Sequence, residues 1–407
     1  MAERRYRVLF VGSHPVQYAA PVFREMARRG DLDIQVAYCT LRGAEPGVDA
    51  GFGVEVAWDV PLLEGYPWVR VANRSPWPGL RGFFGPFNPG LWDLVRGRKY
   101  DAVVIYTGYR CANFWIVAAA AKLSGVPLLF GTDAHELRSV DGRAWKKRLK
   151  QWLWPRLFRL ADVVIVPSST GAALMRSLGT EEERLVVTPY VVDNDWWTAQ
   201  GERVDPAAVR REWNVPAAAP VVLFCAKLQP WKRPHDVLRA FAKAGVPQAH
   251  LVYAGEGPLR GELEAEAKSL GIAANVRFLG FRNQSQLPAV YRAADLLVLP
   301  SEYEPFGVVV NEAMLCGCPV AVSDRVGAGY DLVSPGENGF TFPCGDVDAL
   351  ARIFRQTLPE RARLREMGEA AHERMESWSP KQNIDSLVRA LDLAGGATAP
   401  ANTGATV

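Results

Sequence analysis

The sequence predicts an α/β protein with two doubly wound parallel-sheet domains. Short β-branched runs alternate with amphipathic segments, which is typical of parallel strands joined by helices. The alternation occurs twice along 407 residues, a length that fits two or three domains at about 150 residues each. Polar, glycine-containing loops follow several of the runs, where doubly wound sheets bind ligands. Two such domains facing each other would enclose a cleft for the chemistry.

The expected strands define the domain organisation. They cover residues 7–11, 33–38, 101–106, 127–130 and 162–166 in the first half, and residues 221–225, 250–254, 275–279, 295–299 and 319–322 in the second. The pattern predicts an N-terminal domain over 1–195, a connection over 196–219, a C-terminal domain over 220–380 and a helix over 381–393. Residues 394–407 carry no charge and little apolar surface, which predicts a disordered tail.

Composition excludes several classes of protein. Hydrophobic residues make up 49% of the chain and charged residues 22%, as in ordinary soluble globular proteins. A net charge of +3 is too small for a polycation that binds nucleic acid. No apolar run approaches the roughly 20 residues of a membrane span, and the N-terminus resembles no cleaved signal, so a cytoplasmic location is expected. The six cysteines lack a CxxC pair, and no metal or other cofactor is expected.

A strand, a loop and a helix between residues 297 and 319 form the first candidate site. Glu304 lies in the loop, and Glu312 follows eight positions later in the helix. Around Phe306, Gly307 and Val308, the first helical turn offers backbone amides and partial positive charge, which favour a phosphate. Carboxylates only accept hydrogen bonds, so Glu304 suits sugar hydroxyls and Glu312 a ribose diol. Taken alone, two glutamates at this spacing would indicate only a solvated helix face.

This E-x7-E spacing resembles the signature of family 4 glycosyltransferases, which have the GT-B architecture of two facing Rossmann-like domains. Residues 226–234 look like the family's basic segment, with Ala226 where many relatives have glycine. Similar segments follow in the family's order at residues 253–258, 276–281 and 335–340. The resemblance places a set of residues in the donor site: Lys227 and Lys232 at the diphosphate, Gly255 in the same site, and Phe281 and Arg282 beside the nucleobase.

The two lysines also have a physical reason to lie there. A departing nucleoside diphosphate gains negative charge, and an ammonium 4 Å away offsets about 4 kcal/mol at an effective dielectric constant near 20. Lys227 and Lys232 would therefore activate the leaving group without a metal. Each alone would be an ordinary surface lysine, and Gly255 a simple turn. Their occurrence together at consecutive strand ends indicates a phosphate ligand.

The loop after the first expected strand is the candidate acceptor site. In the family this loop contacts acceptor and donor, which implies acceptor-binding roles for Gly12, Ser13, His14 and Gln17. Ser13 departs from the more frequent double glycine. For His14, the alternative is a histidine that is hydrogen-bonded within its own loop.

A second polar loop follows the expected strand at residues 127–130. Asp133 and His135 lie in it, at the position where many relatives have a polar loop that faces the transferred sugar. The resemblance makes both residues candidates for contacting acceptor or sugar hydroxyls during catalysis, together with Glu304. The alternative for Asp133 is a helix cap.

Residues 143–160 contain seven basic residues, three tryptophans and no acidic residue. Such a segment can lie on an anionic membrane surface, which is one interpretation and implies peripheral contact with the inner face of the membrane. The alternative is an ordinary helix that packs its apolar side on the sheet and keeps its lysines solvated. Pro155 is expected to interrupt the helix.

Together these features predict an enzyme that moves a sugar from a nucleoside-diphosphate sugar to an acceptor hydroxyl, in glycan, glycolipid or glycosylated-metabolite synthesis. The resemblance implies retention of the anomeric configuration. The sequence contains no hydrolase, zinc-protease or Walker motif and no GxGxxG after the first strand. Their absence argues against a hydrolase, a zinc protease, an NTPase and a nicotinamide-dependent enzyme. The alternatives are a nucleotide-sugar epimerase or phosphorylase of the same architecture, and a non-catalytic module that binds sugar nucleotides or membranes.

Overall fold

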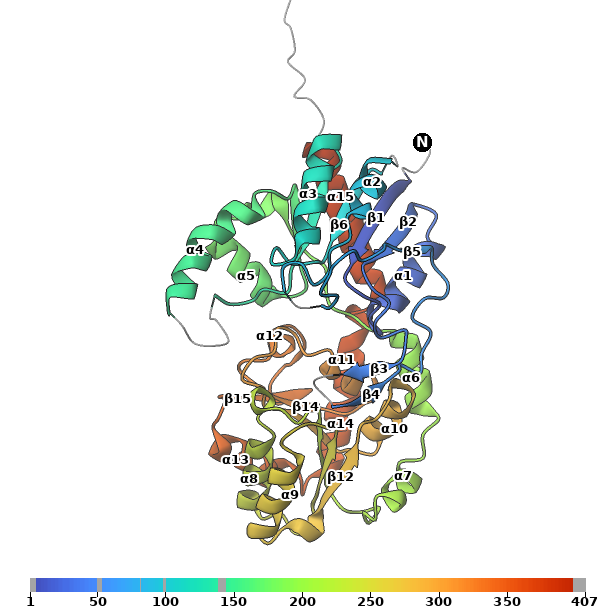
Figure 1. The fold of residues 1–407 in the computed structure, drawn as a ribbon. Helices are drawn as coiled ribbons and strands as arrows, with labels where there is room; N and C mark the ends of the chain where they lie inside the picture. The colour runs from blue at the N-terminus through green and yellow to red at the C-terminus, as the bar shows by residue number, and fades with distance from the viewer. Residues whose placement is uncertain (1–4, 50–52, 81, 98–99, 138–143, 398–407) are drawn as a thin grey trace, which may run out of the picture. The chain divides into compact units, whose positions relative to one another are not determined.

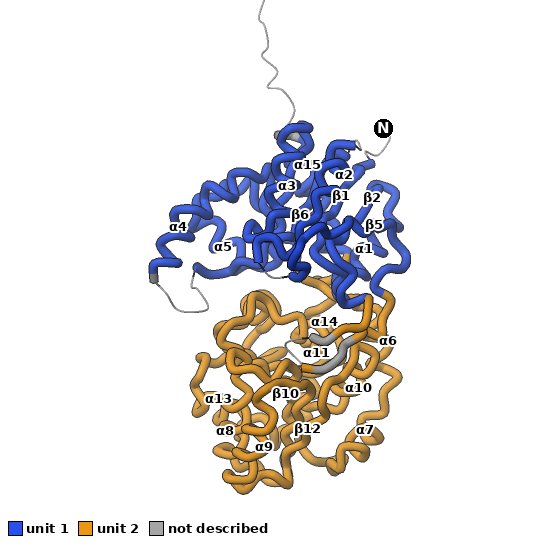
Figure 2. The backbone as a smooth tube through the Cα atoms, in the orientation of Figure 1, with its two compact units in different colours: residues 1–44, 62–189, 381–407 blue, residues 45–61, 190–380 orange. Residues whose placement is uncertain are grey.

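The computed structural model describes residues 5–49, 53–80, 82–97, 100–137 and 144–397 (Figure 1). The chain forms two compact units (Figure 2). The first unit contains residues 1–44, 62–189 and 381–407, and the second contains residues 45–61 and 190–380. Each described unit is built on one parallel sheet with helices between successive strands, which confirms the predicted fold class.

The first unit contains a seven-stranded sheet in the order β5-β2-β1-β6-β7-β8-β9. Its strands are β1 (Tyr6–Gly12), β2 (Leu32–Tyr38), β5 (Trp68–Arg70), β6 (Ala102–Ile105), β7 (Leu128–Gly131), β8 (Val163–Val166) and β9 (Leu185–Val187). The unit's helices are α1 (Ala19–Arg28), α2 (Gly90–Gly97), α3 (Ala112–Ser124), α4 (Ala144–Phe158), α5 (Ser169–Ser177) and most of α15 (Pro380–Ala397). Every residue of β6, β7 and β8 is buried, as expected for short apolar strands covered on both faces.

The second unit contains a six-stranded sheet in the order β12-β11-β10-β13-β14-β15. Its strands are β10 (Val221–Cys225), β11 (His250–Ala254), β12 (Val276–Gly280), β13 (Leu296–Leu299), β14 (Val320–Ser323) and β15 (Gly339–Phe342). The unit's helices are α6 (Asn194–Glu202), α7 (Pro206–Glu212), α8 (Pro234–Ala244), α9 (Arg260–Ser269), α10 (Leu287–Arg292), α11 (Val309–Leu315), α12 (Gly327–Leu332), α13 (Val347–Thr357) and α14 (Arg361–Arg374). The central strands β10 and β13 are neighbours, so the loops that follow them begin at the same edge of the sheet.

The segment expected to connect the domains is part of the second unit. Arg210 of α7 donates a 2.9 Å hydrogen bond to Asp295, which also accepts from the Val221 amide at 2.7 Å. Arg361 donates to the same carboxylate from α14 at 3.0 Å. Because this buried carboxylate joins α7 to the start of β10, the connection is anchored to the second sheet.

A short hairpin from the N-terminal part of the sequence also belongs to the second unit. Strands β3 (Gly47–Asp49) and β4 (Val54–Val56) pair with each other in antiparallel fashion. The chain after β4 then binds the second unit, where Asp59 accepts from the Ser285 amide at 3.1 Å and Asn283 donates to the Ala57 carbonyl at 2.7 Å. We call residues 45–61 the arm. No pattern in the sequence distinguished the arm from the N-terminal domain.

Helix α15 packs on the first unit. Arg29 donates to Asp385 at 2.5 Å, the Tyr6 hydroxyl donates to Asp392, and Asn383 donates to the Pro189 carbonyl at 2.8 Å. The helix runs to Ala397, so residues 394–397, which were expected in a disordered tail, are helical, and Ala394 is buried. The rest of the expected tail, 398–407, lies outside the described residues.

Two further features bear on the predicted membrane contact. Helix α4 continues through Pro155, so the expected interruption at this proline is wrong. Proline is accommodated there because the segment packs into the core of the first unit through Trp154, Leu157 and Phe158. Among the described residues, no helix is long and apolar enough to cross a membrane.

Candidate active site

The loop between β13 and α11 holds the first predicted carboxylate. Lys232, which follows β10, donates to the Glu304 carboxylate, and the Ser301 hydroxyl donates to the same oxygen at 3.4 Å. The Lys232 and Glu304 side chains are 19% and 15% exposed, so their ion pair is partly shielded from water. The structure therefore brings together two predicted donor-site residues that lie 72 positions apart in the sequence.

Backbone contacts fix the shape of the Glu304 loop. Gly307 has a φ of +99°, and a Cβ there would lie 3.2 Å from the Glu304 side chain, so a larger residue would strain the turn. The Gly327 amide donates to the Glu304 carbonyl at 3.1 Å, and the Ala328 amide donates to the Phe306 carbonyl at 2.8 Å. The start of α12 thus supports the loop, which leads through Val308 into α11.

Glu312 is buried in α11, where the Tyr291 hydroxyl donates to it at 2.7 Å. Burial disfavours the charged carboxylate and raises the pKa of Glu312 to about 7, although the hydrogen bond from Tyr291 acts in the opposite direction. Glu312 therefore changes protonation near neutral pH. Tyr291 was missed in the sequence analysis because it reaches Glu312 from another helix, α10.

The loop after β11 supports the segment that carries Lys227. Gly255 has a φ of +147°, and a Cβ there would lie 2.1 Å from the Ala226 carbonyl oxygen, so only glycine fits against this backbone. The Leu228 amide donates to the Glu256 carbonyl at 2.9 Å. These contacts hold the backbone on both sides of Lys227 against the loop after β11.

Phe281 and Arg282 follow β12, and the arm lies beside them. The Trp58 ring meets the Phe281 ring edge to face, with centroids 6.3 Å apart. Asn283 also accepts from the Asp59 amide at 3.3 Å, so the arm is bonded to the residue next to Arg282. Trp58 is a further neighbour of the predicted nucleobase site, and it lies more than 200 residues away in the sequence, where no local pattern could indicate it.

In the first unit, the acceptor loop follows β1. The Ser13 hydroxyl and His14 Nδ1 are 2.8 Å apart, so His14 is hydrogen-bonded within its own loop, as the alternative interpretation expected. Burial and the nearby charge of Arg42 lower the pKa of His14, which keeps its imidazole neutral at neutral pH. Gln17, the fourth predicted residue, lies in the turn just before α1.

Asp133 and His135 lie beyond β7 in an irregular segment. Residues 132–137 are not helical and α4 begins at Ala144, so the interpretation of Asp133 as a helix cap is wrong. The Tyr106 ring covers the end of β7, because a Cβ on Gly131 would lie 2.3 Å from this ring. Tyr106 was not singled out from the sequence, because no local pattern indicates that its ring lies against Gly131.

Models of two known families match the chain. The model for glycosyl transferases group 1 matches residues 207–374, and the model for a glycosyl transferase 4-like domain matches residues 15–191. A D-inositol 3-phosphate glycosyltransferase from Mycobacterium tuberculosis strain H37Ra is 34% identical over 387 residues, which cover 88% of this chain and 78% of the relative. A protein with the same name from Rhodococcus jostii is 28% identical over 418 residues, covering 96% and 89%.

Solved structures show the same fold. The Anabaena protein Alr3699/HepE, in complex with UDP and glucose, matches with a TM-score of 0.72 at 22% identity, covering 95% of this chain and all of that one. WaaG, a glycosyltransferase involved in lipopolysaccharide biosynthesis, matches with a TM-score of 0.62 at 16% identity, covering 98% and 100%.

The chain belongs to the group 1, family 4 glycosyltransferases with the GT-B fold. It is an enzyme that transfers a sugar from a nucleotide sugar. The prediction of a glycosyltransferase is thereby confirmed over an epimerase, a phosphorylase or a non-catalytic module.

Proposed function

We propose that the donor is a uridine-diphosphate sugar bound by the second unit. The main support is the contact between Lys232 and Glu304 at the loop that leads into α11. In this proposal the Lys232 ammonium neutralises the diphosphate, and the neighbouring Glu304 carboxylate accepts hydrogen bonds from the sugar hydroxyls. The Anabaena structure in complex with UDP and glucose favours uridine among the nucleotides to test.

The other donor-site residues have complementary roles in this proposal. Lys227 and Lys232 offset the charge that develops on the departing diphosphate, while Gly307 and Val308 let it approach the amides at the start of α11. Glu312 accepts hydrogen bonds from the ribose diol. Phe281 and Arg282 border the base, and Phe306 and Gly255 shape the backbone around the site.

The acceptor hydroxyl attacks the anomeric carbon as the bond to the diphosphate breaks, and the hydroxyl proton passes to a donor phosphate oxygen. Retention of configuration is part of the proposal and rests on the family resemblance. Asp133 and His135 contact hydroxyls of the acceptor or the transferred sugar, and the acceptor loop at residues 12–17 holds the acceptor. A neutral His14 suits this role because it can hydrogen-bond to hydroxyls without adding charge.

Thermal shift measurements with UDP-, GDP- and ADP-sugars test the choice of donor. A ligand of the native state at 100 times its Kd stabilises it by about 2.7 kcal/mol. We expect a UDP-sugar to raise the melting temperature most, and the Glu312→Ala variant to lose this rise. A larger rise with a GDP- or ADP-sugar would reject uridine, while an unchanged rise in the variant would reject the ribose role of Glu312.

We further propose that transfer needs no metal ion, because the two lysines assigned to the donor site, Lys227 and Lys232, can neutralise the diphosphate. Adding excess EDTA to enzyme, donor and acceptor is expected to leave kcat unchanged. A loss of activity that Mg²⁺ or Mn²⁺ restores would contradict this proposal and assign part of the neutralisation to a cation.

The exposed face of helix α4 is the basis for a proposal of peripheral membrane contact. Trp145, Leu149 and Trp152 are 57%, 47% and 59% exposed, and their spacing places them on one face of the helix. The flanking basic residues on the same helix are Lys146, Lys147, Arg148, Lys150 and Arg156. We propose that this exposed face enters the headgroup region of an anionic membrane.

Sedimentation with vesicles tests the membrane proposal. The protein is expected to sediment with phosphatidylserine-containing vesicles at low salt, less at high salt, and less when Trp145 and Trp152 are both replaced by serine. Replacing Trp77, an exposed tryptophan outside α4, with serine provides the matched control. Failure of the unmodified protein to sediment at low salt would reject the proposal.

A further inference from the structure

Tyr291 lies where three helices of the second unit, α6, α10 and α11, pack against one another (Figure 1). The side chain is fully buried, and its ring packs against the Trp197 ring of α6, with centroids 5.9 Å apart. Its hydroxyl has two polar neighbours: Cys225 Sγ at 3.5 Å, at the end of β10, and the Glu312 carboxylate at 2.7 Å, in α11. Because a carboxylate is a much stronger acceptor than a thiol, the hydroxyl donates to Glu312.

Further hydrogen bonds hold the end of α10 in place. Arg292, the residue after Tyr291, donates to the Cys316 carbonyl at the end of α11 at 3.1 Å. From α7, the buried Arg210 donates to the Ala293 carbonyl at 2.9 Å. Three successive residues, 291 to 293, are thus bonded to neighbouring helices. The position of the Tyr291 hydroxyl is therefore fixed relative to α11.

The hydrogen bond from Tyr291 favours the ionised form of Glu312. Burial raises the pKa of Glu312 to about 7, and the bond from the tyrosine hydroxyl acts in the opposite direction. Within the described residues, these two effects determine the pKa of this carboxyl group. Removing the hydroxyl would leave the effect of burial unopposed and shift Glu312 further toward its protonated form.

Other ionisable groups also lie around Glu312. Burial raises the pKa of the Cys225 thiol to about 12, and it raises the pKa values of Tyr291 and Cys316 above their ordinary values. All three therefore stay protonated around neutral pH. On α14, His372 Nδ1 lies 2.8 Å from a backbone carbonyl of α11. Histidine is the residue type that changes charge near neutral pH, so His372 needs a control of its own.

We propose that Tyr291 is a positioning residue of the donor site, whose hydroxyl holds the Glu312 carboxylate oriented and ionised for the two ribose hydroxyls. This inference rests on the proposed function, because it takes Glu312 as the partner of the ribose. An ionised carboxylate has about four acceptor positions, so the bond from Tyr291 leaves enough for both hydroxyls of the diol. A protonated carboxyl group turns one of its oxygens into a donor, which does not match a diol that donates twice. Tyr291 thus acts on the donor only through Glu312.

Titration of UDP into the Tyr291→Phe variant at pH 6, 7, 8 and 9 tests the inference. Phenylalanine keeps the ring beside Trp197 and removes only the hydroxyl, which should raise the pKa of Glu312 by about one unit. We expect the variant to bind UDP about fivefold more weakly than the unmodified protein at pH 7, and within about twofold of it at pH 9, where Glu312 is ionised in both. The terminal phosphate of UDP titrates alike in both titrations and cancels in the ratio of the two Kd values. A ratio that stays constant from pH 6 to pH 9 would overturn the inference, because a loss of packing weakens binding equally at every pH.

Two further variants serve as controls. His372→Asn keeps a donor for the backbone carbonyl of α11 but does not titrate, so its Kd for UDP relative to the unmodified protein should be the same at every pH. A His372→Asn ratio that follows the Tyr291→Phe profile would assign the pH dependence to the histidine and overturn the inference. In a Glu312→Gln background, Tyr291→Phe should add no pH-dependent change, because no carboxyl group is left to ionise. A pH-dependent change in that background would also overturn the inference.

The two proposals fail in different measurements. An affinity for UDP at pH 8 that is the same in Glu312→Gln and in the unmodified protein would reject the ribose role of Glu312 in the proposed function. Weaker binding in Glu312→Gln, together with a constant Tyr291→Phe ratio, would reject the role of Tyr291 alone. Denaturant unfolding reads the carboxyl group without UDP. Relative to the double variant, Tyr291→Phe should continue to lose stability up to a pH about one unit higher than the unmodified protein does relative to Glu312→Gln, and equal end points would overturn the inference.

Discussion

Replacing Lys232 with methionine is expected to lower kcat/KM for the donor by about 100- to 1,000-fold, the usual effect of losing one group that stabilises transition-state charge. The Lys232 ammonium lies at the Glu304 carboxylate, in the loop before α11 where we propose that the donor diphosphate binds. The ammonium stabilises the diphosphate most in the transition state, when the leaving group gains its charge. The substitution should therefore lower kcat more than the affinity for the donor. Steady-state kinetics with a UDP-sugar, together with calorimetric titration of UDP, measure the two effects separately.

The first control for the Lys232→Met variant uses its ion-pair partner, Glu304. Lys232→Met leaves the partly buried Glu304 carboxylate without its cation, which also lowers the free energy of unfolding. The double variant with Glu304→Gln relieves that cost, so it should recover stability without recovering activity. Lys243→Met, which breaks an exposed pair with Asp348 on the same unit, should leave kcat/KM unchanged. A Lys232→Met enzyme with kcat/KM within about threefold of normal would contradict the leaving-group role.

The proximity of Lys232 and Glu304 could be predicted from the sequence because both residues follow parallel strands of the same sheet. Lys232 and Glu304 lie beyond β10 and β13, which pair directly, so a topology deduced from alternating strands and helices already places their loops side by side. Gly255 and Gly307 could be identified for the same reason. Close backbone approach at a strand end requires glycine, and both positions have a positive φ.

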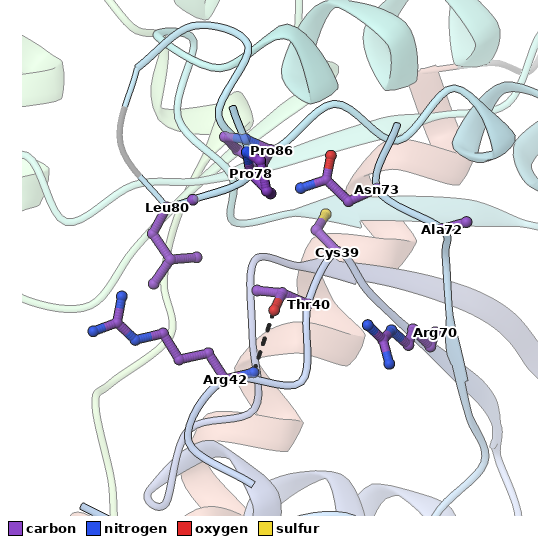
Figure 3. A pocket seen from close by; sticks show the side chains of 10 residues that line it. Cys39, Thr40, Arg42, Arg70, Ala72, Asn73, Pro78, Leu80 and Pro86 are labelled. Carbon is purple, nitrogen blue, oxygen red and sulfur yellow. Dashed lines mark hydrogen bonds between the residues drawn. The ribbon is translucent and has the colours of Figure 1, made fainter. Parts of the chain in front are cut away.

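The missed features depend on contacts between distant segments. The arm contains two strands of three residues each, too short for a periodic signal, and its Asp59 meets Ser285 across 226 positions. Strands β5 and β9, at the edges of the first sheet, are equally short. The cavity lined by Arg42 and Arg70 likewise combines a residue beyond β2 with the last residue of β5, and no spacing rule connects them (Figure 3).

The second large expected effect is a pH dependence of the free energy of unfolding, which is caused by the burial of Glu312. Its pKa in the folded chain is about 7, compared with 4.5 for an ordinary glutamate. A carboxyl group whose pKa is raised by folding binds its proton more tightly in the native state. Its contribution to stability is fully present below pH 4.5 and is lost as the pH rises through 7. The pKa difference corresponds to a change of about 3 kcal/mol in the free energy of unfolding.

The Glu312→Gln variant is expected to remove this dependence. Glutamine keeps the shape of the side chain and can accept the hydrogen bond from the Tyr291 hydroxyl, but it carries no titrating proton. Denaturant unfolding at pH 5, 6, 7 and 8 measures the free energy of unfolding of the variant and of the unmodified protein. The titrations of all other groups cancel in the difference between the two free energies. The unmodified protein should lose stability relative to the variant as the pH rises. A constant difference over this range would show that Glu312 titrates outside it.

The same carboxyl group couples donor binding to protons. A ribose diol donates two hydrogen bonds, which favours the ionised form of Glu312, so UDP should bind more tightly above pH 7 than at pH 6. Binding should then release a proton, which calorimetry detects as a dependence of the measured heat on the ionisation enthalpy of the buffer. Glu312→Gln should bind UDP more weakly and with less proton release, because only the terminal phosphate of UDP, which itself titrates near pH 6, still loses a proton. Proton release that is equal in the variant and the unmodified protein would show that Glu312 does not ionise on binding, and Glu312 would then be a packing residue of α11 rather than the partner of the ribose.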